Sequence, residues 1–107
     1  MNISSTIKPP YFAVIFTSEL NENAPNYESL SNHMVELVQQ QPGFLGFDSA
    51  REETGITVSY WKDEASILNW SNNIEHQEAQ RLGKEKFYKS YTIRICKVER
   101  AYSFKNN

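Results

Sequence analysis

The residues best suited to chemistry lie between Val58 and Gly83. This stretch holds Trp61 and Trp70, the two tryptophans of the chain, together with His76, one of its two histidines. An imidazole titrates near neutral pH and can remove a proton from a substrate, and indole rings form flat apolar walls for a small organic ligand. These residue types at this spacing indicate an aromatic site in which His76 is the candidate general base.

The residues next to His76 extend the predicted site. In a helix that begins at Ile74 and turns by about 100° per residue, Glu75 points inward and His76 lies on the border of the inward face. The residues assigned to the solvent face of this helix are Gln77, Gln80, Arg81 and Lys84. An inward carboxylate needs a polar partner, and Arg94 and Tyr91 on the last predicted strand are candidates.

Two interpretations of Glu75 and His76 remain open. In the first, both residues belong to the first helical turn and satisfy its free N–H groups and its positive dipole end. In the second, His76 is a base at the mouth of a cavity, and Trp61 and Trp70 stack on the substrate ring. The donors expected to favour a substrate anion in that cavity are Arg94, Tyr91 and Tyr60.

The elements that must position this site follow the order β-α-β-β-α-β. Strands are expected over residues 11–17, 44–51, 56–61 and 89–104, where apolar, β-branched and aromatic residues dominate. From Tyr27 onward, apolar residues recur every three or four positions, which predicts an amphipathic helix with His33 at its surface edge. Asp63 and either Asn72 or Asn73 are expected to cap two later helical segments. This order is typical of an α+β, ferredoxin-like fold with an antiparallel sheet.

We expect one domain over residues 10–104, preceded by a flexible leader at 1–9 and followed by a tail at 105–107. The first and last strands are apolar on both faces, whereas two helices can cover only one face of a four-stranded sheet. The sequence therefore predicts a homodimer whose free sheet faces pack against each other. Cys96, in the last strand, is expected to be a buried structural thiol.

The composition argues against several classes of function. The chain of 107 residues has a net charge of −2 and scattered basic residues, so we expect no nucleic-acid partner. No apolar run approaches the ~20 residues that span a bilayer, and the first residues lack the apolar core of a signal peptide, so we expect a cytoplasmic protein without a membrane partner. No spacing of histidines or cysteines predicts a metal site.

Two motifs carry a resemblance to a known family. Residues 60–70, YWKDEASILNW, resemble the central motif of the antibiotic biosynthesis monooxygenase family, and PGFLGFD at 42–48 resembles its second strand. The segment EHQEAQRLGKEKFYKSYTIRICKVERAYSF is similar to a bacterial branch of that family. The resemblance covers residues 10–104 and implies a dimeric α+β barrel. It also implies cofactor-independent oxidation of a small aromatic or phenolic compound with O2.

Other members of this family bind and degrade haem. They share two tryptophans spaced like Trp61 and Trp70, but their haem-ligating histidine falls where this chain has Gln80. They also use an asparagine in the first strand, where this chain has apolar residues at 13–16. These departures disfavour haem, and no cofactor is expected. The main alternative to an enzyme is a non-catalytic, ligand-binding or stress-associated dimeric module.

Overall fold

The computed structural model describes residues 7–106, except for the side chain of Ile74. The elements follow the predicted order, with the second helical region divided into three segments. They are β1 (Tyr11–Leu20), α1 (Tyr27–Val38), β2 (Phe44–Arg51), β3 (Thr54–Trp61), α2 (Glu64–Ser71), α3 (Ile74–Leu82), the π-helix η1 (Gly83–Phe87) and β4 (Tyr88–Val98). The strands form one antiparallel sheet in the order β2-β3-β1-β4, which confirms the α+β, ferredoxin-like prediction.

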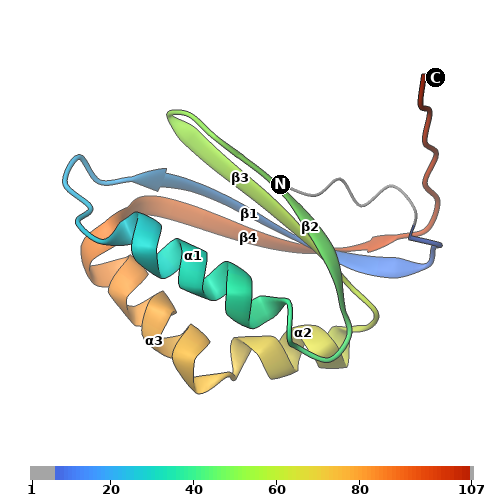
Figure 1. The fold of residues 1–107 in the computed structure, drawn as a ribbon, viewed down its shortest axis with the longest axis horizontal. Coiled ribbons are helices and arrows are strands. Elements are labelled where there is room, and N and C mark those ends of the chain that lie inside the picture. Colours follow the sequence, from blue (N-terminus) through green and yellow to red (C-terminus); the bar gives the residue numbers. More distant parts are fainter. Residues whose placement is uncertain (1–6, 107) are drawn as a thin grey trace.

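The helices lie on one face of this sheet (Figure 1). Strand side chains alternate between the two faces, so the pairing register assigns each residue to a side. Val14 pairs with Ser59 on β3 and with Ile95 on β4, and this row lines the space below the helices. The next row, which includes Arg94, points to the opposite face. Within residues 7–106, no helix or strand covers that opposite face.

Two side-chain caps hold the region that carries Trp70 and His76. The carboxylate of Asp63 accepts hydrogen bonds from the N–H and the hydroxyl of Ser66, at 2.8 and 2.7 Å, and so begins α2. The side-chain oxygen of Asn73 accepts a hydrogen bond from the N–H of His76 at 3.1 Å and begins α3. Both caps agree with the prediction. Because each one fixes the first turn of a short helix, they also fix where the two rings lie.

The last strand is shorter than predicted. It ends at Val98 instead of residue 104, and residues 99–106 have no regular structure and extend away from the sheet (Figure 1). β4 ends at Val98 because its partner strand β1 extends no farther. Val98 pairs with Tyr11, and the two residues before Tyr11 are prolines. Proline has no N–H to donate to a ladder, so the pairing stops there.

Cys96 is exposed, so the prediction of a buried thiol is wrong. It lies on edge strand β4, on the sheet face opposite the helices.

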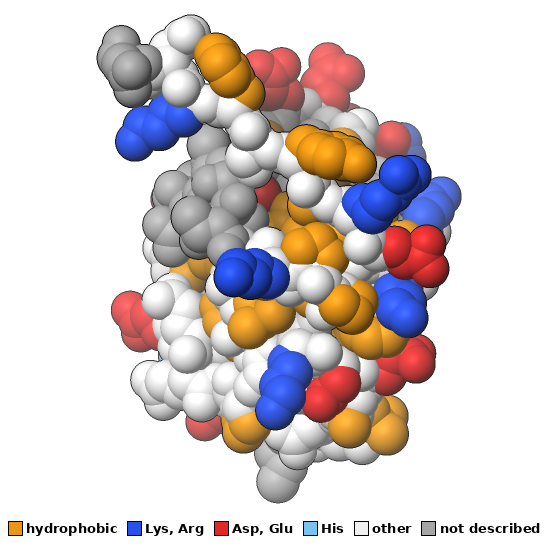
Figure 2. Space-filling model, turned by 90° about the vertical axis from the view of Figure 1, so that its right-hand side faces the viewer, with side chains coloured by type: hydrophobic (Ala, Val, Ile, Leu, Met, Phe, Trp, Pro, Cys, Tyr) orange, Lys and Arg blue, Asp and Glu red, His pale blue; other side chains and the backbone are white. Residues whose placement is uncertain are grey.

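At one end of the molecule, hydrophobic side chains gather over the middle of the surface, and Lys and Arg side chains are dispersed among and around them (Figure 2). Among the described residues, no helix is long and apolar enough to cross a membrane.

Candidate functional site

A cavity of about 840 Å³ lies between the helices and the sheet. No residue of α1 is fully buried, because its apolar residues Leu30, Met34 and Val38 line this cavity instead of filling a core. The packed core is correspondingly small. Among the described residues, its buried hydrophobic members are Tyr11, Ala13, Trp61, Ile67 and Phe87. An apolar wall that borders a hollow is typical of a small-ligand site.

His76 lies in the wall of this cavity, at the end of a stack of three aromatic side chains. Its imidazole stacks on Trp70, with the ring centroids 4.0 Å apart and the planes at 13°. Trp70 in turn stacks on Trp61 at 6.4 Å and 28°. Trp61 is completely buried, and its Nε1 donates a hydrogen bond to the hydroxyl of Ser59 at 2.9 Å. The aromatic stack therefore fixes the imidazole of His76 to the sheet through the fully buried indole of Trp61.

The protonation of the His76 ring follows from its hydrogen bond. Nδ1 lies 2.9 Å from the backbone oxygen of Trp70, which can only accept. Nδ1 therefore carries a hydrogen in either charge state. In the neutral ring, Nε2 then holds the free lone pair, and it makes no hydrogen bond to any residue within the described part of the chain. This is the form in which a histidine acts as a general base.

Burial lowers the pKa of His76, and the hydrogen bond to Trp70 opposes this effect only in part. The unperturbed pKa is 6.5, so the ring is neutral at pH 7. Proton acceptance at Nε2 is therefore available at neutral pH without a prior deprotonation.

Trp70, His76 and Tyr91 all line the cavity, but Tyr91 pairs with Ser18, the partner of Arg51, and so does not lie beside His76. Tyr91 stacks on Phe16 with their centroids 5.3 Å apart, on the sheet side of the cavity. Trp61 lies behind Trp70, where it supports the wall and does not line the cavity itself.

Glu75 does not lie inward. It is exposed, and its Oε2 lies 3.0 Å from Nε2 of His33 on α1, so its partner is neither Arg94 nor Tyr91. The expected surface position of His33 is confirmed. Gln80, assigned by periodicity to solvent, lines the cavity. The face of α3 that lines the cavity therefore includes His76 and Gln80, whereas the predicted inward face had His76 on its border and Gln80 in solvent.

Tyr60 and Arg94 lie on the sheet face opposite the cavity. Their rows in the register are those of Ala13 and Ile15, whereas Val14 faces the helices. The hydroxyl of Tyr60 donates to Asp48 at 2.7 Å, and burial together with this bond raises the pKa of Tyr60 to about 12. Neither residue reaches the space beside His76 within this chain.

Sequence reasoning missed the other end of the cavity, where Arg51, Tyr27 and Tyr88 meet. The guanidinium of Arg51 lies over the ring of Tyr27, 5.6 Å from its centroid, and Nη2 donates to the hydroxyl of Ser18. Burial, and then the hydrogen bond with Tyr27, raise the pKa of Tyr88. Strand alternation carried the signal, because Arg51 shares its parity on β2 with the apolar Phe47.

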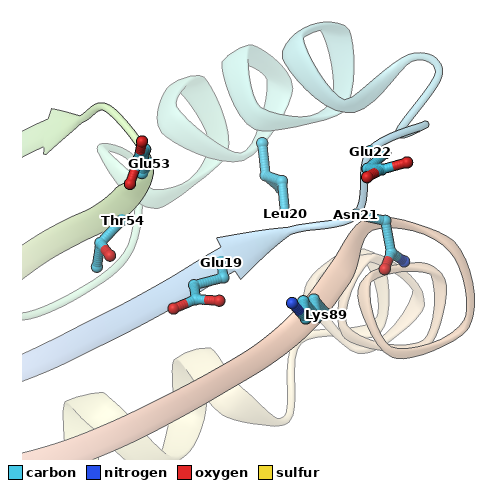
Figure 3. Close-up of a pocket in the computed structure, with 7 residues that line it drawn as sticks. All are labelled: Glu19, Leu20, Asn21, Glu22, Glu53, Thr54 and Lys89. Carbon is cyan, nitrogen blue, oxygen red and sulfur yellow. The ribbon is translucent and has the colours of Figure 1, made fainter.

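A second, polar pocket of about 520 Å³ lies where β1 ends, beside β4 and the β2–β3 turn. Its carboxylates do not converge, because Figure 3 shows Glu19, Glu22 and Glu53 pointing apart, with Lys89 nearest to Glu19 and Asn21. Among the described residues, no group of three His, Cys, Asp or Glu side chains could hold a metal ion. This pocket offers no reactive pair of groups, and the cavity of His76 remains the candidate site.

Most of the chain matches a known protein family. The sequence pattern of the family described as "Antibiotic biosynthesis monooxygenase" matches residues 10–82, which include β1 through α3 and both site tryptophans. The chain belongs to the antibiotic biosynthesis monooxygenase family. The predicted resemblance is thereby confirmed over these residues.

Three relatives illustrate the range of the antibiotic biosynthesis monooxygenase family around this chain. The uncharacterized protein YqjZ of Bacillus subtilis is 45% identical over 107 residues, covering 98% of this chain and 94% of that protein. The jasmonate monooxygenase ABM of Pyricularia oryzae is 24% identical over 97 residues, which are 81% of this chain but only 43% of that enzyme. The crystal structure of SnoaB, a cofactor-independent oxygenase from Streptomyces nogalater, superposes with a TM-score of 0.73 at 12% identity, covering 87% of this chain and 97% of SnoaB. At that identity the likeness to SnoaB shows the shared fold.

Proposed function

We propose that the chain is a cofactor-independent monooxygenase that oxidises a small phenolic compound with O2. The observation that carries the proposal is the neutral His76, which lines an apolar cavity with Nδ1 bonded to a backbone oxygen and Nε2 free. Family membership and the SnoaB-like fold support the same chemistry.

The reaction begins with transfer of the phenol proton to Nε2 of His76. The phenolate gives one electron to O2, which leaves a phenoxyl radical and superoxide, and their recombination forms a C–O bond on the ring. The imidazolium of His76 returns its proton to the peroxide oxygen, and loss of water from the resulting hydroperoxide yields a quinone. Phenol and O2 thus become quinone and water, and each product receives one oxygen atom of O2. The substrate supplies all four electrons, so the reaction needs no external reductant.

The protein has two tasks in this scheme. The first is to hold the base, which the stack on Trp70 and the hydrogen bond to its backbone oxygen achieve. The second is to hold an aromatic ring in a mostly apolar space, where Trp70 offers an aromatic wall beside His76, and Phe16 and Tyr91 line the cavity farther along the sheet. A base placed in this way contributes on the order of 10²–10⁴-fold to the rate.

The proposal is tested by O2 uptake and quinone formation with a panel of naphthols and larger hydroxyarenes. His76→Ala should lower kcat by about 10²-fold or more, because the base is lost while the cavity remains. Affinity for the phenol, measured by calorimetry, should change little. The matched control is His33→Ala, which removes the exposed histidine paired with Glu75 and should leave turnover unchanged.

Full turnover by His76→Ala would remove that residue from the mechanism. Binding of phenols without O2 consumption by the unmodified chain would reject the monooxygenase and favour the ligand-binding module instead.

We further propose that the chain acts as a homodimer joined through the sheet faces that lie opposite the helices. The support is that no helix or strand of residues 7–106 covers this face, and that the register puts Ile56, which is 46% exposed and borders the cavity at the sheet, in a row of this face with Thr17. Apolar side chains on an uncovered sheet face are stabilised by burial against a second copy.

A further inference from the structure

Arg51 is a cation without an anionic partner in the wall of the cavity. No Asp or Glu among the described residues lies within ion-pair distance of its guanidinium. Its contacts are the hydroxyl of Ser18, which is 2% exposed, and the ring of Tyr27. Nη1 is buried and has no hydrogen-bond partner among these residues.

The fold around this guanidinium is shaped to hold it. Gly55 pairs with Arg51, and a Cβ there would overlap the guanidinium, so a side chain at this position of β3 would displace the end of Arg51. The neighbouring Tyr88 offers no negative charge either, because burial raises the pKa of its hydroxyl. A buried guanidinium with an unsatisfied nitrogen is costly, and the chain retains it at the end of the cavity where apolar residues could have filled the space.

We propose that Arg51 binds a carboxylate of the ligand, so that the substrates of this site are hydroxyaryl carboxylic acids. The planar guanidinium fork matches a carboxylate, and the lining of the cavity around it is mostly apolar. Nη1 becomes available when the end of the side chain turns toward the cavity that it lines. The identification of this ligand as a substrate rests on the proposed function, whereas the recognition of its carboxylate does not.

The positions of the two cavity ends indicate the shape of such an acid. Trp61 supports the stack that ends in His76, and Gly55 pairs with Arg51. Trp61 and Gly55 lie at opposite ends of β3. Six residues of strand span about 20 Å at ~3.3 Å per residue. A ligand that pairs with Arg51 and presents its phenol to His76 is therefore elongated, with the hydroxyl and the carboxylate at opposite ends.

The experiment compares 8-(4-hydroxyphenyl)octanoate with its primary amide by isothermal titration calorimetry under anaerobic conditions. The two probes share their length and apolar surface, and only the acid carries a charge. The unmodified chain should bind the acid about tenfold or more tightly than the amide. Arg51→Met should abolish this preference, and Arg51→Lys should retain part of it because the charge remains without the fork.

The matched control is Arg81→Met, which removes an exposed arginine that pairs with Glu78 and Glu85 on the outer side of the α3–η1 region. It should bind the acid with unchanged preference. Equal affinity for acid and amide in the unmodified chain would overturn the proposal, and this result does not depend on whether Arg51→Met folds. A preference that survives in folded Arg51→Met would overturn it as well.

The outcome is separable from that of the proposed function, because binding is measured without O2. If the acid preference follows Arg51 while no phenol is turned over, the monooxygenase fails and the carboxylate site stands. If phenols are oxidised but acid and amide bind equally, the carboxylate site fails alone.

Discussion

Replacing Gly43 by alanine should strongly destabilise the scaffold beneath the site. Gly43 lies just before β2 with a φ of +81°, a conformation that costs a residue with a Cβ about 1–2 kcal/mol. The added Cβ would also lie 2.5 Å from Cβ of Ser66 and nearer still to its hydroxyl oxygen, in the first turn of α2. Overpacking of this kind costs about 1–3 kcal/mol.

Together the two effects predict a loss of about 2–5 kcal/mol in the free energy of unfolding, a large part of a typical total of about 5–15 kcal/mol. Urea denaturation followed by tryptophan fluorescence measures this loss, because Trp61 is completely buried in the folded chain. Protein concentration is held constant, so that any association affects all variants equally.

A double-mutant cycle with Ser66→Gly separates the two causes. The glycine removes the atoms that the new Cβ would strike, so the double variant should recover the steric part, about 1–3 kcal/mol, and keep the cost of the positive φ. The reasoning is refuted if Gly43→Ala loses less than about 0.5 kcal/mol, the usual effect of a neutral surface change. It is also refuted if Ser66→Gly recovers nothing.

Three further predictions concern the site and the assembly. Since the pKa of His76 in the folded chain is lowered from 6.5, the unfolded chain protonates this ring at a higher pH than the folded chain does, and the free energy of unfolding should fall as the pH drops below 6.5. In urea titrations, His76→Gln should lose this part of the pH dependence. The turnover rate should not change with pH above 6.5, where His76 is already neutral. Ile56→Glu, on the sheet face opposite the helices, should convert a dimer into a monomer in analytical ultracentrifugation, whereas Lys84→Glu on the helical side should not; a monomeric unmodified chain would contradict the proposed assembly. Titration with haem should give no shifted Soret band, because Gln80 stands where the haem-binding relatives place their histidine, and a stoichiometric Soret shift would show the opposite.

Much of the fold could be predicted because local signals were strong. The hairpin between β2 and β3 and the caps at Asp63 and Asn73 depend on short-range chemistry that is visible in the sequence. The end of β4 was missed because it depends on its partner. Pairing stops where Pro9 and Pro10 precede Tyr11, at the far end of the chain, and the apolar residues after Val98 give no sign of this.

The site was harder to predict than the fold. Tyr60 and Trp61 are adjacent on one strand and so must point to opposite faces, and the same alternation separates Tyr91 from Arg94. Applying this rule to the candidates would have divided them correctly. The inward face of α3 is a different problem, because the helix has few apolar residues and its roll is set by the cavity and by contacts such as that of Glu75 with His33.

The long outer border of the sheet has a consequence for solubility. Strand β4 is a sheet edge of 11 residues, and Ile93 and Ile95 are about half exposed along it, at 47% and 54%. Open borders of this kind invite fibrillar stacking with other chains. Lys89, Arg94 and Lys97 place exposed positive charges along the same border, so two such borders repel each other when they approach side by side.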